Sequence, residues 1–542
     1  MASQHPSMPS TSREVTLYSE DDSDTSYEPS GDSESDTSSD MDDEESDEPS
    51  LSSGDEGYLD EWIDGDGSPP DLPFSGKEEV KGDIDPNIEP IGIFDLLFTE
   101  VLLTQIVRET NRRGEQLFDE SERRKTKRIL RWKETDIEEL KKFLGLCLLI
   151  GNIKFPSLAS YWSTNPLYFH PVFGKIMSRN RFELILSVLR FVDHSNVNIN
   201  DKLFKIRPVI DELIEKFNFY LSPGQNLSLD EAMILWRGRL SFRQYVIGKR
   251  HKFGIKLYEL CTPEGYVLNV LVYTGKGMII EPTAVRHSDA VVHKLLNNYI
   301  NKGHVVYMDR FYNSVELAEK LIKDGTYICG TINMNRKSNP KDLVVKKIKK
   351  GTVATKYKGP VLVTKWKDKR DVLMISTKHR HEMVKTKNKR GVEKEKPKCI
   401  VDYNTNMSGI DRADQMTSYY STPRKTIKWY RKVFFHFLDI SLSNGHLLYQ
   451  RVTGKKIDLL SFRNSIINSL FGNSDNQPSR KRKRSEDHYP EPCPLTGKTA
   501  LKRCRECHSK GVRKRSRYQC ASCEDNPGLC VYPCFMNWHK KN

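Results

Sequence analysis

A change of hydrophobic periodicity at Pro223-Gly224 divides this sequence into two kinds of structure. Before it, apolar residues recur at intervals of three and four, as in IFDLLFTEVLLTQIVRETNRR (93–113), which predicts amphipathic helices. After it the apolar runs are short and are typical of strands. These runs are NLSLDEAMILW (226–236), RLSFRQYV (239–246), FGIKLYELC (253–261) and YVLNVLVYT (266–274).

The pattern then alternates between helix and strand. A helical segment (288–303) precedes the strand HVVYMD (304–309), and the helix SVELAEKLIKDG (314–325) precedes the strand YICGTI. This order is typical of the RNase H-like fold, with one acid on the first strand and another ending the strand after the first helix. Asp230 and Asp309 occupy those two positions. We therefore predict a multidomain α/β protein with an RNase H-like core.

Charge is unevenly distributed along the chain. The net charge is +13, yet residues 1–66 hold 22 Asp and Glu against a single basic residue, Arg13. The remainder carries roughly +34, which predicts a polyanionic partner whose affinity falls steeply with salt. The acidic segment contains few apolar residues, so we expect a disordered tail over residues 1–85.

Membrane and secretory signals are not expected in this sequence. No hydrophobic run approaches the ~20 residues that a membrane span needs. The first ten residues, MASQHPSMPS, lack the apolar centre of a secretory signal. We expect an intracellular protein with no membrane partner.

Seven of the eleven cysteines lie between Cys493 and Cys534, which in an intracellular protein favours metal over disulfides. Two tetrahedral zinc sites need eight ligands, and the paired spacing suggests two interleaved sites, a cross-brace. Seven ligands are evident: Cys504, Cys507, Cys520, Cys523, Cys530, Cys534 and His539. The candidates for the eighth are His488, Cys493 and His508.

Several motifs occur in an order that resembles the piggyBac-type DNA transposases over about residues 90–540. No single motif is specific, but the ordered set is. The motifs are YWSTNP, MSRNRFELIL, SLDEAMILWRGRLSFRQYV, GIKLYELC, YMDRFYNSVELAEKL, CGTINMNRK and DYNTNMSGIDRADQMTSYYSTPRKTIKWYRK, followed by the cysteine-rich end.

The resemblance implies an RNase H-like catalytic core, interrupted by an insertion domain and flanked by a helical domain for dimerisation and DNA binding. A cross-brace zinc finger follows. The expected segments are a disordered tail (1–85), the helical domain (86–225 and 421–470), the catalytic core (226–332 and 399–420), the insertion domain (333–398), a linker (471–487) and the zinc finger (488–542).

The resemblance also implies a catalytic triad of Asp230, Asp309 and Asp411 that binds two Mg²⁺, with Mn²⁺ as a substitute. Asp414 lies three residues after Asp411, on the same face of a helix, and the sequence leaves open which of the two is the tighter ligand. The chain departs from the family at Arg310, where Asn is usual. A guanidinium there could pair with a phosphate or with a catalytic carboxylate.

Basic and aromatic residues near these acids predict contacts with double-stranded DNA, through phosphates and base stacking. For the aromatic pair Trp429 and Tyr430 the alternative is a helix end with core aromatics. The candidates are Arg237, Arg239, Arg243, Lys249, Arg250, Arg424, Lys425, Lys428, Trp429 and Tyr430, together with Arg513, Lys514 and Arg515 between the cysteine pairs.

Three further expectations follow from the resemblance. The family has a His well before the first Cys pair, which favours His488 as the eighth of the ligands for two structural Zn²⁺. A homodimer would hold two transposon ends together. The basic run SRKRKRS (479–485) predicts a nuclear import receptor as a partner and a nuclear location, with a solvated charge run as the alternative.

The activity that the resemblance implies is cut-and-paste transposition. The enzyme would cut each transposon end, form a hairpin there, open it and join the freed 3′-hydroxyl to target DNA at TTAA. One alternative is a domesticated, catalytically silent derivative that binds DNA or chromatin. Another is a zinc-dependent chromatin-interaction protein in which the core is only a scaffold.

Overall fold

The computed structural model describes most of the chain after the acidic segment. The described residues are 61–65, 67, 69–124, 129–195, 200–247, 252–275, 278, 280, 286–387, 391, 393–422, 426–472, 488–494, 501–523 and 525–541. The import motif and most of the predicted linker, residues 473–487, lie outside the described residues.

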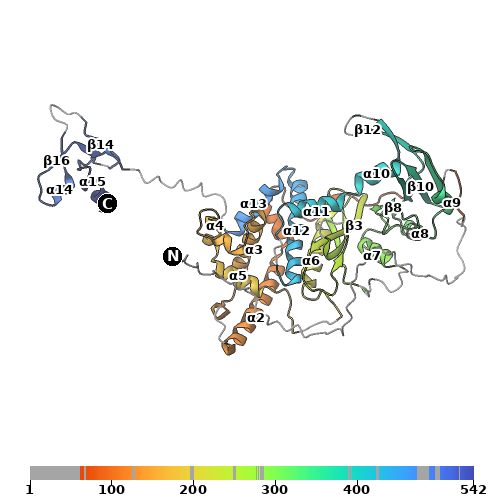
Figure 1. Ribbon diagram of the computed structural model, residues 1–542, viewed down its shortest axis with the longest axis horizontal. Coiled ribbons are helices and arrows are strands. Elements are labelled where there is room, and N and C mark those ends of the chain that lie inside the picture. Colours follow the sequence, from red (N-terminus) through yellow and green to blue (C-terminus); the bar gives the residue numbers. More distant parts are fainter. Residues whose placement is uncertain are drawn as a thin grey trace, which may run out of the picture. The chain divides into compact units, whose positions relative to one another are not determined.

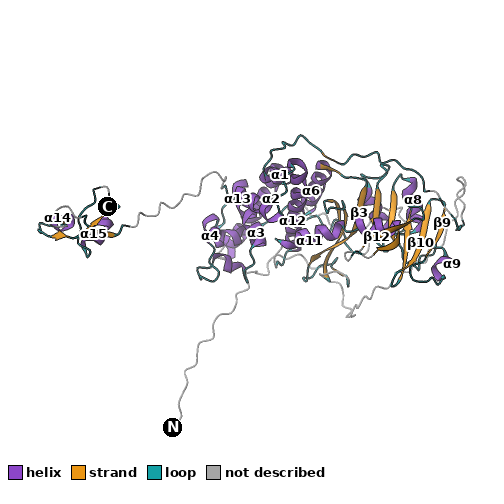
Figure 2. Ribbon diagram, turned by 90° about the horizontal axis from the view of Figure 1, so that it is seen from above, coloured by secondary structure: helices purple, strands orange, loops and turns teal. Residues whose placement is uncertain are grey.

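A nine-stranded mixed sheet forms the centre of the α/β part (Figures 1 and 2). Its order is β4-β5-β3-β7-β8-β11-β10-β9, and β6 also pairs with β5. The pairs β3–β7 and β7–β8 are parallel, and the other pairs are antiparallel. The strands are β3 (Asn226–Leu235), β4 (Gln244–Tyr245), β5 (Phe253–Cys261), β6 (Val267–Val272), β7 (Val305–Met308), β8 (Tyr327–Thr331), β9 (Val353–Lys358), β10 (Val361–Lys367) and β11 (Asp371–Ser376).

The predicted alternation of strand and helix is confirmed. Helix α7 (His287–Leu296) connects β6 to β7, and α8 (Val315–Lys323) connects β7 to β8. All four residues of β7 are buried, as expected for a central parallel strand covered on both faces. The hydroxyl of Ser314 caps α8 by accepting a hydrogen bond from the Leu317 amide.

Only part of the predicted insertion (333–398) is separate from the central sheet. Its strands β9, β10 and β11 extend the central sheet, because β11 pairs antiparallel with β8. Such pairing covers an edge of β8 that would otherwise expose unpaired backbone groups. Only β12 (Met383–Lys387) and β13 (Glu393–Pro397) form a two-stranded ribbon of their own.

The helical part packs around one long, mostly buried helix, α12 (Trp429–Thr453). The side-chain amide of Asn444 on α12 exchanges two hydrogen bonds of 2.8 Å with the backbone of Val267 on β6, which joins the helices to the sheet. The other helices are α1 (Pro90–Leu97), α2 (Glu100–Arg124), α3 (Ile137–Asn152), α4 (Pro171–Ile176), α5 (Arg179–Val188), α6 (Arg207–Tyr220) and α13 (Leu459–Leu470).

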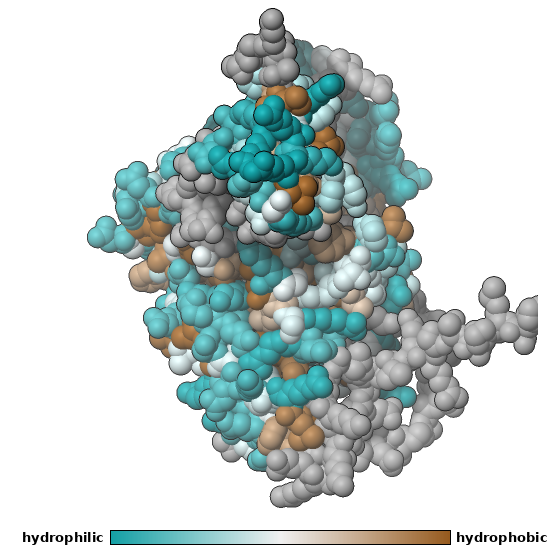
Figure 3. All heavy atoms as spheres, turned by 90° about the vertical axis from the view of Figure 1, so that its left-hand side faces the viewer, coloured by the Kyte–Doolittle hydropathy of each residue, from teal (hydrophilic) through white to brown (hydrophobic). Residues whose placement is uncertain are grey.

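No single helix in the described part of the chain is long and apolar enough to cross a membrane. One bent pair, α1 with Glu100–Glu120 of α2, would qualify by length and composition alone. The apolar residues Ile93, Phe94 and Leu97 of α1 are buried in the core. In the face drawn in Figure 3, hydrophilic side chains predominate and apolar ones are scattered.

Residues 61–85 differ from the predicted tail because they lie along the body of the protein. Ile63 exchanges backbone hydrogen bonds of 2.9 and 3.0 Å with Tyr357 on β9. The Tyr327 hydroxyl donates to the Pro70 carbonyl over 2.6 Å, and β1 (Glu79–Val80) pairs with β2 (Leu221–Ser222). Residues 61–85 therefore belong to the body of the protein and not to a tail.

A buried ion pair connects α12, α13 and the chain that enters α12. Arg463 on α13 lies 3.4 Å from the carboxylate of Asp439 on α12, and both side chains are almost fully buried. Asp439 also accepts hydrogen bonds from the Thr422 amide and hydroxyl, and Arg463 donates to the Tyr420 carbonyl. Burial raises the pKa of Asp439 to about 6, opposed by the Arg463 charge.

We predict that Arg463→Met destabilises the protein by about 3–5 kcal/mol, because it leaves the Asp439 carboxylate buried without its partner. Urea unfolding of the full chain, followed by circular dichroism, measures the change. Adding Asp439→Asn removes the stranded charge and keeps an acceptor for Thr422, so the double variant should recover most of the loss. A double variant no more stable than Arg463→Met would contradict this account.

Candidate metal centres and nucleic-acid interface

Asp230 lies on β3, and Asp309 directly follows β7, the parallel neighbour of β3. The β3–β7 register pairs Ser228 with Tyr307 and Leu229 with Met308, so the next residues, Asp230 and Asp309, stand one step further on. Both side chains are half-buried. The side-chain amide of Asn313 donates to the Met308, Asp309 and Thr331 carbonyls over 2.9–3.1 Å, and thus ties the end of β7 to the end of β8.

A further carboxylate, which no sequence pattern indicates, lies beside Asp230. Glu259 on β5 is the direct antiparallel partner of Asp230 and is 2% exposed. Paired residues on adjacent strands project from the same face of a sheet. Only the strand register, which periodicity does not specify, brings Glu259 to Asp230.

Asp414 belongs to the same neighbourhood. Burial raises the pKa of the Cys261 thiol well above its usual value, and the negative charges of Glu259, Asp414 and Asp230 raise it further. Cys261 lies two residues after Glu259 and pairs with Ser228, so it projects from the same face of the sheet as Asp230. The negative charge of Asp414 therefore lies near the face of the sheet from which Asp230 projects.

Helix α11 (Gly409–Tyr419) carries Asp411 and Asp414 and packs directly on β3 (Figures 1 and 2). Its first residue must be glycine, because a Cβ at Gly409 would stand 2.5 Å from the Thr262 carbonyl oxygen and 2.1 Å from the Ser228 hydroxyl oxygen. Ile410 is buried, Asp414 is half-buried and Asp411 is exposed.

The four aspartates do not form a compact ligand set of the kind a single ion requires. Among the described residues, no three of their ligand atoms lie within 4.8 Å of one another. Two ions about 3.5–4 Å apart need a wider set of ligands than one ion does. Oxygens that bind different ions of the pair lie further from each other than oxygens that share an ion. Arg310, which follows Asp309 directly, is exposed.

Apart from Tyr430, the predicted DNA-contacting residues of the main body fall into three groups. Arg237, Arg239 and Arg243 are exposed. Lys428 and Trp429 are half-buried, and the Trp429 and Phe242 rings pack edge to face at a centroid distance of 5.3 Å. The others, Lys249, Arg250, Arg424 and Lys425, lie outside the described residues.

Tyr430 is a core residue in this structure. It is 3% exposed, and its ring packs edge to face on Phe191 and His194. Tyr430 therefore fits the alternative interpretation, a helix end with core aromatics. The prediction that this ring stacks on DNA bases is wrong, because the ring is buried. The position of Tyr430 next to Trp429 in the sequence does not predict its burial, because adjacent residues of a helix face different directions.

The cysteine-rich end forms two groups of possible metal ligands. The first consists of Cys504, Cys507, Cys530 and Cys534, with all four sulfurs within 4.8 Å of one another. Cys507 lies 3.9 Å from Cys530 and 3.4 Å from Cys534, near the ~3.8 Å expected between sulfurs on tetrahedral zinc. Burial disfavours ionisation of Cys504, but hydrogen bonds from the Cys507 and Cys530 amides outweigh it and lower its pKa to about 7.

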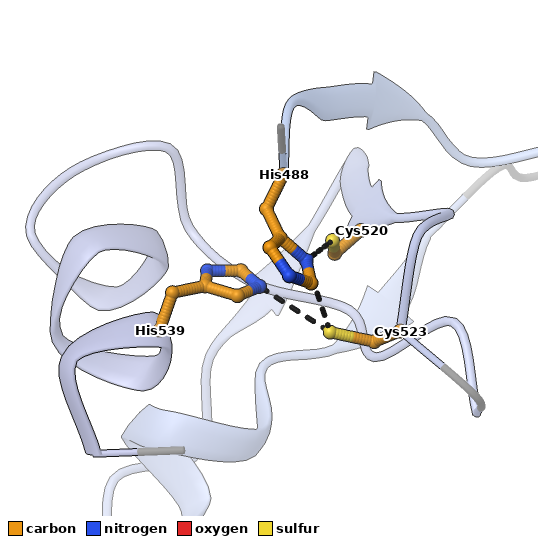
Figure 4. Close-up of side chains that lie close together, drawn as sticks. All are labelled: His488, Cys520, Cys523 and His539. Carbon is orange, nitrogen blue, oxygen red and sulfur yellow. Dashed lines mark hydrogen bonds between the residues drawn. The ribbon is translucent and has the colours of Figure 1, made fainter. Parts of the chain in front are cut away.

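The second group consists of His488, Cys520, Cys523 and His539 (Figure 4). Cys523 lies 3.5 Å from His488 Nδ1 and 3.3 Å from His539 Nε2, and Cys520 lies 3.1 Å from His488 Nδ1. His539 Nδ1 donates to the Phe535 carbonyl over 2.8 Å, which leaves Nε2 as the nitrogen for a metal. The two groups interleave along the chain, as in a cross-brace.

The other two candidates for an eighth ligand lie outside both groups. Cys493 is buried, and its thiol donates to the Ser516 carbonyl. His508 is exposed on α14 (Arg505–Ser509). The remaining elements are β14 (Pro490–Pro492), β15 (Lys502–Arg503), β16 (Arg515–Ser516), β17 (Tyr518–Cys520) and α15 (Cys534–Lys541), and the basic residues Arg513, Lys514 and Arg515 are exposed.

Comparison with known proteins identifies relatives. A human protein named "PiggyBac transposable element-derived protein 3" is 26% identical over 411 residues, which are 71% of this chain and 68% of that protein. "PiggyBac transposable element-derived protein 2", also human, is 26% identical over 429 residues, 74% of this chain and 70% of that protein.

A solved structure shares the fold. It is described as "Cryo-EM structure of piggyBac transposase synaptic complex with hairpin DNA (SNHP)" and matches with a TM-score of 0.64 and 23% identity, over 84% of this chain and all of that chain. Residues 485–540 match the model for a "DDE_Tnp_1-like zinc finger". The model for "Transposase IS4" matches residues 89–446, about two thirds of the sequence. The chain therefore belongs to the Transposase IS4 family, among its piggyBac-like members, as its motifs had indicated.

Proposed function

We propose that this protein is a cut-and-paste DNA transposase. The observation that supports the proposal is that Asp230 lies on β3 beside the end of β7, which Asp309 directly follows, and that α11, which carries Asp411 and Asp414, packs on β3. The strand order β6-β5-β3-β7-β8 supports an RNase H-like core: antiparallel pairing joins the first three strands, and parallel pairing joins the next two to β3.

The donor set suits magnesium. Asp230, Asp309, Asp411 and Asp414 offer only carboxylate oxygens, the hard ligands that Mg²⁺ prefers and that Mn²⁺ also accepts. Two such ions, when bound, would supply charge stabilisation to attacking and leaving oxygens of a phosphodiester. The acids would fix the positions of these ions, and the exposed Arg237, Arg239 and Arg243 would hold the DNA strand nearby.

The proposed reaction sequence consists of in-line displacements at phosphorus. Water cuts one strand at each transposon end, and the freed 3′-hydroxyl attacks the opposite strand to form a hairpin. Water opens the hairpin, and the 3′-hydroxyls then attack target DNA at TTAA. The structural relative in complex with hairpin DNA supports the hairpin step. Two ends must be held together, so we propose a homodimer on double-stranded DNA.

For the cysteine-rich end we propose two structural Zn²⁺ ions. Cys504, Cys507, Cys530 and Cys534 would bind one, and His488, Cys520, Cys523 and His539 the other. The exposed Arg513, Lys514 and Arg515 would contact transposon-end DNA. The run SRKRKRS would bind a nuclear import receptor and direct the protein to the nucleus.

A silent, domesticated derivative is the second candidate. The human relatives are named as derived from transposable elements, and Arg310 departs from the family pattern beside Asp309. All four aspartates are present in the chain, which favours retained chemistry. Strand cleavage separates the two candidates, since both would bind DNA.

We predict that Asp230→Asn or Asp309→Asn lowers excision to below about 1% of the wild-type level, because loss of a metal ligand costs several kcal/mol of transition-state stabilisation. The measurement is excision from a plasmid carrying the terminal sequences that flank this chain's coding region. Glu231→Gln is the matched control, because it removes a carboxylate from the opposite face of the same strand. Wild-type protein that binds these ends without cutting them in Mg²⁺ or Mn²⁺ would instead identify a silent derivative.

We predict that the full chain contains two zinc ions and that His488→Ala reduces this to one, because three remaining ligands hold the ion too weakly. Metal content per chain is measured by atomic emission after dialysis. His508→Ala is the control, since this exposed histidine lies outside both ligand groups, and it should retain two ions. Equal zinc in the two variants would refute the assignment of His488.

Replacing Arg513, Lys514 and Arg515 together by Ala should weaken DNA binding and flatten its dependence on salt. Each phosphate contact contributes about 0.9 to the slope of log affinity against log salt, so the slope should fall by about 2–3. Fluorescence anisotropy with a labelled duplex at several salt concentrations measures it. Replacement of the exposed Lys346, Lys347 and Lys350 controls for lost charge alone, and an equal fall there would exclude a specific role for the zinc finger.

A further inference from the structure

Two exposed aromatic rings stand side by side on the paired strands β4 and β5. Tyr245 and Phe253 are direct partners in the β4–β5 register, they are 41% and 45% exposed, and their ring centroids lie 4.6 Å apart. Rings of this size are mostly covered in folded proteins, because they carry a large apolar surface. Among the described strands, β4 ends the central sheet, so a partner can reach this pair at the edge of the sheet.

A guanidinium group lies on one of the two rings. Arg243 stands over the Phe253 ring, 5.6 Å from its centroid. Hydrogen bonds of 3.2 and 3.4 Å to the carbonyls of Arg237 and Gly238 hold it there. A planar guanidinium can stack on a nucleobase and also pair with a phosphate. We call Tyr245, Phe253 and Arg243 together the aromatic platform.

The aromatic platform lies on the face of the sheet that carries Asp230. Alternate residues of a strand project from the same face, and Phe253 precedes Glu259, the partner of Asp230, by six residues along β5. At about 3.4 Å per residue, the rings stand about 20 Å from the acids. A DNA strand at the acids covers this distance with about six nucleotides at the spacing of duplex DNA.

The sequence around the aromatic platform suits a polyanion. Residues 237–256 contain seven Lys and Arg and no Asp or Glu. Lys252, which directly precedes Phe253, is exposed. The neighbouring Phe242 packs against Trp429, another of the predicted DNA contacts. Cations interleaved with exposed rings are typical of sites for single-stranded nucleic acid, where the cations follow the backbone and the rings stack on bases.

We propose that the aromatic platform binds unpaired bases of the DNA near the cut by stacking them on its rings. The inference rests on the proposed function and adds single-stranded DNA to its partners. Within a duplex, neighbouring base pairs cover the faces of each base, so an intact duplex offers this surface mainly its phosphates. The proposed hairpin step supplies unpaired bases, because a duplex end that is closed on itself leaves bases at its tip without partners.

The test replaces both rings by leucine in the full, zinc-loaded chain. The control variant, Phe169→Leu with Phe219→Leu, removes two rings that are 60% and 54% exposed but lie outside residues 237–256. Fluorescence anisotropy measures the affinity for a short labelled single strand and for the duplex of the same sequence. We expect Tyr245→Leu with Phe253→Leu to weaken single-strand binding about 10–100-fold, with the duplex affinity and the melting temperature unchanged.

Two further variants separate stacking from a structural role of the ring pair. Cross-strand aromatic contacts can stabilise a sheet without any ligand. The exchange Tyr245→Phe with Phe253→Tyr keeps both stacking surfaces and should bind single strands as wild type does. Should the leucine variant melt early, Tyr245→Thr decides, because a β-branched residue suits a strand: it must weaken single-strand binding, and normal binding there would overturn the inference.

The outcomes also separate this inference from the proposed function. If wild type excises DNA and the leucine variant binds single strands as tightly as the control variant, only the aromatic platform is overturned. Equal losses for single strand and duplex would also overturn it, because they would indicate contacts with phosphates and not with bases. If wild type cuts no DNA, the proposed function fails, and a selective loss of single-strand binding in the leucine variant still supports the platform.

Discussion

The in-register pairing of three parallel strands, β3, β7 and β8, is the constraint on which the rest of the site depends. It places Asp230, Asp309 and Thr331 in one row at the ends of the strands, and Asn313 ties two of those ends together. A slip of one residue would turn Asp230 to the opposite face of the sheet. Burial of β7 on both faces opposes such a slip, because it would exchange the residues packed on each side.

Two helices from much later in the chain pack on these strands. Helix α11 packs on β3 with no room for a side chain at Gly409, and this contact brings Asp414 to the sheet face that carries Asp230. Helix α10 (Lys398–Asn406) is anchored by the Ser376–His379–Asp402 chain of hydrogen bonds on the strands that extend the sheet beyond β8. The added strands therefore fix the position of α10 on the sheet.

Periodicity predicted the strands and helices of the core in their correct order, because each has one buried face or is buried altogether. Asp230 was recognisable because it interrupts an apolar strand, and the cysteine pairs were recognisable by their spacing. Three expectations differed from the structure: the separate insertion, the tail extending to residue 85 and the stacking role of Tyr430. Each concerns what a segment packs against, and this is not encoded in local pattern.

The sequence by itself determined the kinds of elements, the family and the residue types that could bind metals, since local periodicity, ordered motifs and ligand spacing are properties of the linear chain. Only the tertiary structure decided which of these residues meet. It brought Glu259 and Asp414 to the face that carries Asp230, grouped His488 rather than Cys493 or His508 with Cys520, Cys523 and His539, and buried Tyr430. The physical reason is that strand register and helix docking are set by packing between segments far apart in sequence, and a pattern within one segment carries no record of its partner.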